Sequence, residues 1–210
     1  MPFDLWLTFA AASLALLLIP GPTVLLVLSY ALSKDRSVAV ASAAGVALGD
    51  LVAMTASLLG LGALVLASAT LFTLLKWIGA LYLVYLGVKL IRSAPTSEAL
   101  DLPAADTVTA ARVFGHTAAV TALNPKSIAF FIAFVPQFIR PEAALAPQFT
   151  ILIATFVTLA AANAFAYALA ASRLRRVIAR PGVLTWITRA GGSALIGMGI
   201  LTATLRRGTA

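Results

Sequence analysis

Ionisable residues are scarce in this chain, and two of them stand inside long apolar stretches. Asp50 lies in GVALGDLVAM, and Lys126 lies in LNPKSIAFFIAF. A charged group at such depth is costly and typically marks a site that binds a substrate or relays a proton. Asp50 could bind a proton or an amino group, and Lys126 could bind a carboxylate. The alternatives are a structural ion pair between them and, for Lys126, a long side chain that reaches a polar surface.

Two helix-breaking sequences interrupt apolar stretches of the same kind. Pro20, Gly21 and Pro22 lie in the middle of LALLLIPGPTVLLVL, and Pro125 precedes Lys126. Each proline removes a backbone donor and frees a carbonyl group, which in an apolar setting must be buried in protein or face a polar cavity. A packing kink is the alternative for either break. Because there are two breaks, we favour a site built around both.

Asn124 stands directly before the second break. An asparagine at this position can cap the half-helix that begins at Pro125. The positive N-terminal end of that half-helix would suit a carboxylate. With Lys126 beside it, the second break is therefore predicted to hold an acidic group of a ligand.

The composition indicates the environment of these residues. Of 210 residues, 61% are hydrophobic and 10% are charged, and the mean hydropathy is +1.02. A soluble domain would carry about 25% charged residues. The chain is therefore predicted to be an all-α membrane protein. The net charge of +8 does not indicate a nucleic-acid partner, because the chain has no long basic run. We expect contacts with membrane lipid instead.

Apolar segments long enough to cross a bilayer recur along the chain. Six are predicted, at about residues 5–32, 38–67, 71–91, 113–139, 144–171 and 183–205. The first and fourth contain the breaks. The chain has no cysteine, which excludes thiol redox chemistry, and its single histidine, His116, cannot build a multi-histidine metal site. We expect no cofactor and no bound metal.

Lysine and arginine residues gather at one end of the predicted spans. Ten of the fifteen lie in the loops after spans one, three and five: Lys34, Arg36, Lys89, Arg92, Arg112, Arg173, Arg175, Arg176, Arg180 and Arg189. Cytoplasmic loops carry an excess of these residues, so these loops are predicted to be cytoplasmic and the N-terminus external. Arg206 and Arg207 disagree with six spans. A five-span chain with one re-entrant segment would move them to the cytoplasmic side.

The two halves of the chain resemble each other. Residues 1–92 form a first three-helix unit, residues 93–109 a polar linker, and residues 110–210 a second unit. Asp50 in span two corresponds to Asn163 in span five. Glycines stand eight residues apart in both third spans: Gly79 and Gly87, and Gly191 and Gly199. Each unit has three spans, an odd number, so the second unit would enter the bilayer from the opposite side and be inverted. Many transporters are built in this way, with their site at the midplane.

At these motifs the chain resembles a known family. IPGP, GVALGD, KWIGALYLVYLGVKLI, NPKSIAFFIAFVPQF and a glycine-rich last span occur in this order. The chain is similar to the LysE/RhtB family of bacterial amino-acid exporters over nearly its whole length. The resemblance implies an inner-membrane protein that expels amino acids, driven by the proton gradient. It assigns the site to Pro20, Gly21, Pro22, Gly45, Gly49, Asp50, Asn124, Pro125 and Lys126.

These observations favour a secondary exporter that rocks about a midplane site at the two breaks. Its partners would be a small amino-acid substrate, protons and lipid, with a homo-oligomer left open. The alternatives are a sensory or structural membrane protein and a transporter of another small metabolite. A membrane enzyme is not favoured, because the chain lacks HExxH, GxSxG and paired intramembrane aspartates. Residues 20–22, Asp50 and residues 124–126 are predicted to converge in space.

Overall fold

The structure is a computed structural model that describes residues 1–19, 21–31, 36–93, 109–140, 143–178 and 182–204. Every regular element among these residues is helical. They are α1 (Phe3–Leu18), α2 (Pro22–Ala31), α3 (Arg36–Ala67), α4 (Ala69–Arg92), α5 (Ala110–Ala122), α6 (Pro125–Ala133), the 3-10 turn η1 (Val135–Phe138), α7 (Leu145–Ile178) and α8 (Val183–Thr204). The predicted all-α fold is confirmed for this part of the chain. The predicted linker and the C-terminal arginines lie outside the described residues.

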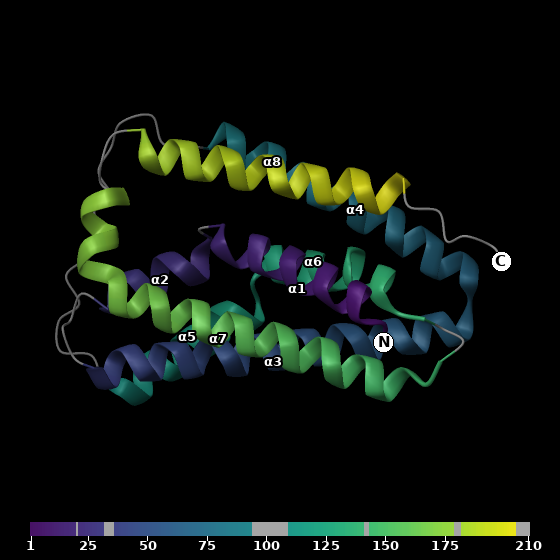
Figure 1. Cartoon of the computed structure of the whole chain (residues 1–210), viewed down its shortest axis with the longest axis horizontal. Coiled ribbons are helices and arrows are strands. Elements are labelled where there is room, and N and C mark those ends of the chain that lie inside the picture. Colours follow the sequence, from purple (N-terminus) through teal and green to yellow (C-terminus); the bar gives the residue numbers. More distant parts are fainter. Residues whose placement is uncertain (20, 32–35, 94–108, 141–142, 179–181, 205–210) are drawn as a thin grey trace.

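The helices run back and forth along the long axis of an elongated molecule (Figure 1). Three have the length and composition to cross a membrane: Arg36–Ala63, Thr73–Arg92 and Leu145–Ala171. Two further pairs of consecutive helices meet the same criteria of length and composition only when both helices of the pair are counted as one segment. α1 and α2 are bent by 60°, and α5 and the segment Pro125–Phe138 by 44°. Each pair is either one broken span or a re-entrant loop, so the described residues contain between three and five candidate spans.

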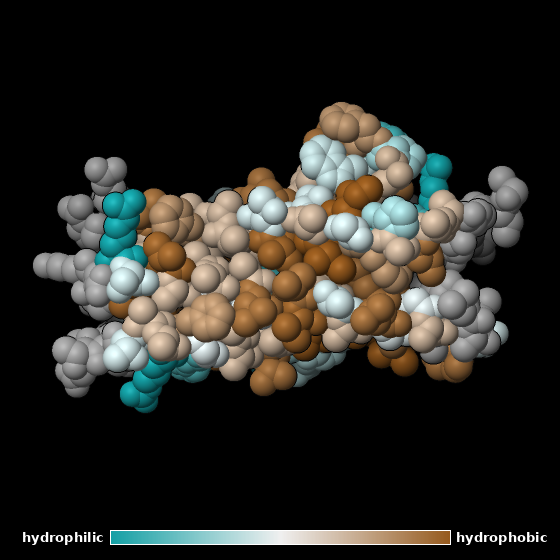
Figure 2. Space-filling view, turned by 90° about the horizontal axis from the view of Figure 1, so that it is seen from below, coloured by the Kyte–Doolittle hydropathy of each residue, from teal (hydrophilic) through white to brown (hydrophobic). Residues whose placement is uncertain are grey.

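α8 is not among these candidates, although it is 22 residues long. It carries Arg189 together with several glycine, serine and threonine residues, which lower its hydropathy. The prediction of six spans therefore stays a prediction. On the face shown in Figure 2, apolar residues cover the middle of the molecule and the most hydrophilic residues lie toward its two ends, as expected of a chain that crosses a bilayer.

The sequence accounts for both interruptions. α1 ends at Leu18, and Ile19 follows in an extended conformation with φ −72° and ψ 117°. Pro22 then opens α2, at the helix position where a missing N–H is harmless. At the second interruption, Asn124 is extended and its side chain accepts a hydrogen bond from the Lys126 amide, with Pro125 opening α6. The predicted capping role of Asn124 is confirmed.

Glycines bring the long helices close together. A Cβ atom at Gly49 would lie 2.6 Å from the Ala118 carbonyl oxygen, so α3 contacts the backbone of α5 directly. A Cβ at Gly87 would lie 2.5 Å from the Gly192 carbonyl oxygen, and one at Gly199 would lie 2.7 Å from that of Ala80. α4 and α8 therefore pack together through backbone contacts at two levels. Small residues allow such close approach in apolar surroundings.

The interior is built around α6 and η1. Phe130 and Phe131 of α6 are fully buried, and both rings pack against Phe156 of α7. Phe138 of η1 meets Phe9 of α1 edge to face, with ring centroids 5.3 Å apart. The short segment after the second break is therefore enclosed by other helices. This arrangement fixes where α6 begins, and with it the position of Lys126.

Candidate functional site

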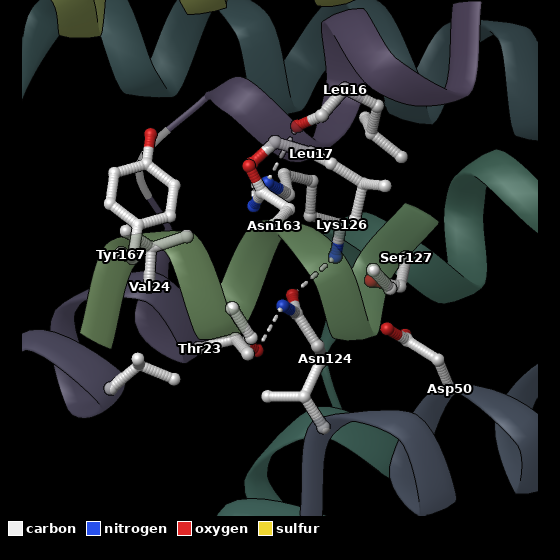
Figure 3. Close-up of a pocket in the computed structure, with 14 residues that line it drawn as sticks. Leu16, Leu17, Thr23, Val24, Asp50, Asn124, Lys126, Ser127, Asn163 and Tyr167 are labelled. Atoms are coloured by element: carbon white, nitrogen blue, oxygen red, sulfur yellow. Dashed lines mark hydrogen bonds between the residues drawn. The ribbon is translucent and has the colours of Figure 1, made fainter. Parts of the chain in front are cut away.

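Residues from both interruptions line one pocket together with Asp50 (Figure 3). Asn124 and Lys126 reach it from the start of α6, Asp50 from the middle of α3, and Asn163 from α7. Its other lining residues include Leu16 and Leu17 at the end of α1, Thr23 and Val24 in α2, and Ser127 and Tyr167. Of the residues predicted to converge, Asp50, Asn124 and Lys126 line this pocket and Gly21 lies beside the Lys126 side chain, whereas Pro22 and Pro125 do not line it. The role of each residue stays a prediction.

The last carbonyl groups of α1 lack a full set of backbone donors, although the Leu16 carbonyl accepts a hydrogen bond from the Ile19 amide at 3.2 Å. A helix has no internal partners for its last carbonyls, and a proline in the next turn offers no donor. Side chains from the second half of the chain supply the missing donors. The Asn163 Nδ2 group donates to the Leu17 carbonyl at 3.1 Å, and the Tyr167 hydroxyl donates to the Leu18 carbonyl at 3.1 Å.

Lys126 supplies the remaining donors. Its Nζ group donates to the Leu16 carbonyl at 3.1 Å and to the Ile19 carbonyl at 2.9 Å. The negative end of the α1 dipole favours a cation at this position. A Cβ atom at Gly21 would lie 3.4 Å from the same nitrogen, so the backbone at the break passes beside the ammonium group. Lys126 thus points toward the first break from the start of the second.

A second set of hydrogen bonds joins the two breaks through Thr23. The Asn124 Nδ2 group donates to Thr23 Oγ1 at 3.0 Å, while its Oδ1 atom caps α6. The Thr121 hydroxyl donates to the same Thr23 oxygen at 3.4 Å. Because Asn124 serves both α2 and α6, a change in the angle between the breaks would disturb both contacts.

Asp50 differs from the other polar residues of the pocket. Its side chain is only 2% exposed, and its Oδ1 atom has no hydrogen-bond partner within the described part of the chain. Asp50 and Lys126 line the same pocket, and their ionised side chains carry opposite charges. A buried carboxylate without a partner is costly. Asp50 is therefore suited to receive a proton or a cationic group.

The structure places the other predicted residues elsewhere. Gly45 and Gly49 face α5 and do not line the pocket. Pro125 lines a separate apolar groove of about 320 Å³ between α4 and α6, beside Gly79 and Leu123. Pro22 opens α2 and is exposed. Pro20 lies outside the described residues.

Three polar residues of the pocket were not predicted: Thr23, Ser127 and Tyr167. Thr23 and Ser127 directly follow predicted residues, Pro22 and Lys126. Tyr167 stands four residues after Asn163, which places both side chains on one face of α7. This spacing is the signal in the sequence that could have identified Tyr167.

The pocket is small in this state. Its cavity volume is about 30 Å³, which is room for about two water molecules. An amino acid cannot enter unless the surrounding helices separate. Within the described residues no three histidine, cysteine, aspartate or glutamate side chains lie close enough to hold a metal. The chemistry that the pocket offers is recognition of polar and cationic groups by carbonyls, amides, hydroxyls and one carboxylate.

Comparison with known proteins gives a consistent family. A family model described as LysE type translocator matches residues 14–206. A membrane protein of Vibrio cholerae is 34% identical over 206 residues, covering 98% of this chain and 100% of that protein. The homoserine/homoserine lactone efflux protein of Salmonella typhimurium is 33% identical over 207 residues, covering 98% and 99%. The leucine efflux protein of Salmonella choleraesuis is 31% identical over 137 residues, covering 65% and 64%. No solved structure matches this chain.

Proposed function

Since this chain belongs to the family of LysE type translocators, we propose that it is a secondary transporter of the bacterial inner membrane that exports amino acids or close derivatives by proton antiport. The family and the names of the relatives support efflux of amino-acid-type compounds by a membrane transporter rather than an enzyme. The observation that carries the proposed mechanism is the convergence of Asp50, Lys126 and the end of α1 on one pocket.

The proposed architecture has six spans in two inverted three-helix units, residues 1–92 and 110–210. The first and fourth spans are broken helices, α1 with α2 and α5 with α6. In this architecture the second helix of each unit would pack against the broken helix of the other unit. Two sets of contacts support it. α3 of the first unit packs against α5 and α6, and α7 of the second unit packs against α1 and α2. The two units would rock about the pocket, which would then lie near the midplane.

The names of the relatives bear on the substrate group that the pocket recognises. The Salmonella typhimurium relative is named for homoserine and its lactone, and the Salmonella choleraesuis relative for leucine. All three compounds carry a primary ammonium group, whereas the lactone has no free carboxylate. Recognition through the ammonium group accounts for the whole set. For substrates with a carboxylate, the start of α6 offers a favourable second contact.

Asp50 is proposed to couple export to the proton gradient. Its carboxylate is buried in the pocket and Oδ1 is without a hydrogen-bond partner among the described residues, so its state depends on what occupies the pocket. A proton and an ammonium group, either of the substrate or of a side chain that the substrate displaces, would then compete for it. Such competition is the simplest route to exchange, because release of one permits binding of the other.

The experiment that tests the function is efflux from loaded, energised cells that express the chain. The panel of test compounds consists of homoserine, homoserine lactone, leucine, threonine, lysine and arginine. In a parallel sample, a protonophore collapses the proton gradient. We expect faster efflux of at least one compound than in cells with an empty vector, and loss of this difference with the protonophore. Unchanged efflux across the panel contradicts the exporter, and efflux that persists with the protonophore contradicts proton antiport.

A further inference from the structure

The carbonyl groups at the end of α1 already hold a primary ammonium group. The Lys126 Nζ atom is bound by the oxygens of Leu16 and Ile19 at 3.1 and 2.9 Å, in a position favoured by the negative end of the helix. An ammonium group has three N–H donors, so one remains for a further partner. The lysine head is chemically equivalent to the primary ammonium group of an amino acid. The structure therefore contains a formed binding site for that chemical group.

The opposite wall of the pocket offers a second place for a cation. Asp50 lines the same pocket, and its Oδ1 atom has no hydrogen-bond partner in the described part of the chain (Figure 3). Lys126 has a long, flexible side chain and is attracted to Asp50. A move from the carbonyls to Asp50 would replace two neutral acceptors by a charged one, which is the stronger type of hydrogen bond.

We propose that the Leu16 and Ile19 carbonyls form the subsite for the primary ammonium group of the transported molecule, and that Lys126 fills this subsite as a tethered substitute while no substrate is bound. This inference rests on the function proposed above and names the part of the pocket that holds the substrate's amino group. On binding, one ammonium group replaces another at the carbonyls, and the displaced lysine pairs with Asp50. Both ammonium groups then have oxygen partners, so substrate binding leaves no additional buried charge without one.

The two ammonium groups cannot occupy the carbonyls together. The cavity of about 30 Å³ has no room for an amino acid beside the lysine head, and two cations at one pair of carbonyls repel each other. Gly21 contributes no side chain that would separate the backbone from the ammonium group. Entry of substrate therefore requires that Lys126 leaves, which makes the lysine a competitor attached to the protein itself.

The test replaces the lysine head by a free ammonium compound. Lys126→Met keeps the length of the side chain up to the carbon that bears Nζ and removes the ammonium group. In the purified full-length protein in detergent, methylammonium chloride should raise the melting temperature of this variant in a saturable manner, as ligand binding to the folded state requires. The wild type should not respond, and tetramethylammonium chloride, which has no N–H donor, should have no effect on either protein.

Two further variants guard against misfolding and against general salt effects. Lys126→Ala removes the side chain beyond Cβ, and n-propylammonium, which matches the three carbons and the nitrogen removed, should stabilise it in the same way. Tyr167→Phe is the matched control, since it removes a neutral donor from the adjacent Leu18 carbonyl and should not respond to methylammonium. If neither Lys126 variant responds, or if Tyr167→Phe or the wild type is stabilised as strongly as the Lys126 variants, the ammonium subsite is absent.

The link to the substrate is tested with L-homoserine, L-leucine and their N-acetyl forms. At least one free amino acid should stabilise Lys126→Met at a concentration about tenfold or more below the concentration needed to stabilise the wild type. The reason is that no tethered ammonium group competes for the subsite in the variant. The N-acetyl forms, which lack the ammonium group, should not bind. A variant that binds no more tightly, or that binds the N-acetyl forms equally, overturns the assignment. Absence of efflux from wild-type cells, in contrast, refutes the transport function and leaves the methylammonium response intact.

Discussion

At the scale of single residues, the pocket holds two opposite charges in unequal environments. Lys126 has two carbonyl partners at 3.1 and 2.9 Å, whereas the Asp50 Oδ1 atom has none in the described part of the chain. The lysine therefore has a structural task in this state, because it completes the hydrogen bonds of a broken helix. The Asp50 Oδ1 atom has no such task among the described residues, which is consistent with the transport role proposed for this residue.

Asp50→Asn should separate these roles. The amide keeps the size of the side chain and removes its charge. Proton-driven uptake into inverted membrane vesicles, which corresponds to export from cells, should therefore fall to the level of vesicles without the protein. The melting temperature should stay equal or rise, because a buried neutral amide costs less than a buried carboxylate whose Oδ1 atom lacks a hydrogen-bond partner, and Lys126 keeps its two carbonyl partners. Asp4→Asn is the control, since Asp4 is exposed in the first turn of α1. Full proton-driven export by Asp50→Asn would refute the coupling role.

The sequence was informative about which residues matter and less so about what they contact. Asp50, Asn124 and Lys126 stand out because a polar side chain in an apolar segment needs a reason to be there. The partner of Lys126 depends on the 60° angle between α1 and α2, which no local pattern specifies. For the same reason, Lys126 was expected to face a carboxylate, and its carbonyl partners were not foreseen. The glycines of α3 were assigned to the site, although they lie against α5.

At the scale of elements, close contacts between helices determine the position of Asp50. α3 carries this residue, and its approach to α5 depends on the absence of side chains at Gly45 and Gly49. The breaks and helix ends were predictable, because proline, asparagine and glycine act locally. The 34-residue length of α7 was not, since its last residues include Arg173, Arg175 and Arg176 and were expected to form a loop.

Gly49→Ala should weaken the contact between α3 and α5. The added Cβ would lie 2.6 Å from both the Ala118 carbonyl oxygen and the Thr121 Cβ atom, so the helices must separate. We expect a loss of about 1–3 kcal/mol in the free energy of unfolding, as for other overpacked cores, measured by denaturation in detergent. Gly60→Ala in the same helix is the matched control, because a Cβ there meets nothing within 4 Å. Equal effects of the two substitutions would argue against the packing role of Gly49.

At the scale of the whole molecule, the number of spans decides which loops share a side of the membrane. Ser93 follows the end of α4, Ala143 precedes α7, and Thr204 ends α8, and all three residues are exposed. Figure 1 places the end of α8 and the start of α7 toward one end of the molecule, away from the end of α4. This arrangement favours the six-span chain, in which the apolar middle of the molecule would match the bilayer.

Single cysteines can test this topology, because the chain has none of its own. In intact cells, a membrane-impermeant thiol reagent should label Ala143→Cys and Thr204→Cys but not Ser93→Cys, if the chain has six spans and the positive loops are cytoplasmic. Permeabilised cells provide the control, in which all three variants should react. Labelling of Ala143→Cys alone in intact cells would instead indicate five spans and a cytoplasmic C-terminus.

The side-chain partners of the first break also affect how the protein is made. The Leu16 carbonyl is completed by a residue 110 positions later in the chain, and the Leu18 carbonyl by one 149 positions later. At a synthesis rate of about 5–20 residues per second, these donors leave the ribosome on the order of ten seconds after α1. Until then, the nascent first span carries free carbonyls that hydrocarbon cannot solvate. Its stable entry into the bilayer must therefore wait for the second half of the chain, or proceed within a water-accessible insertion channel.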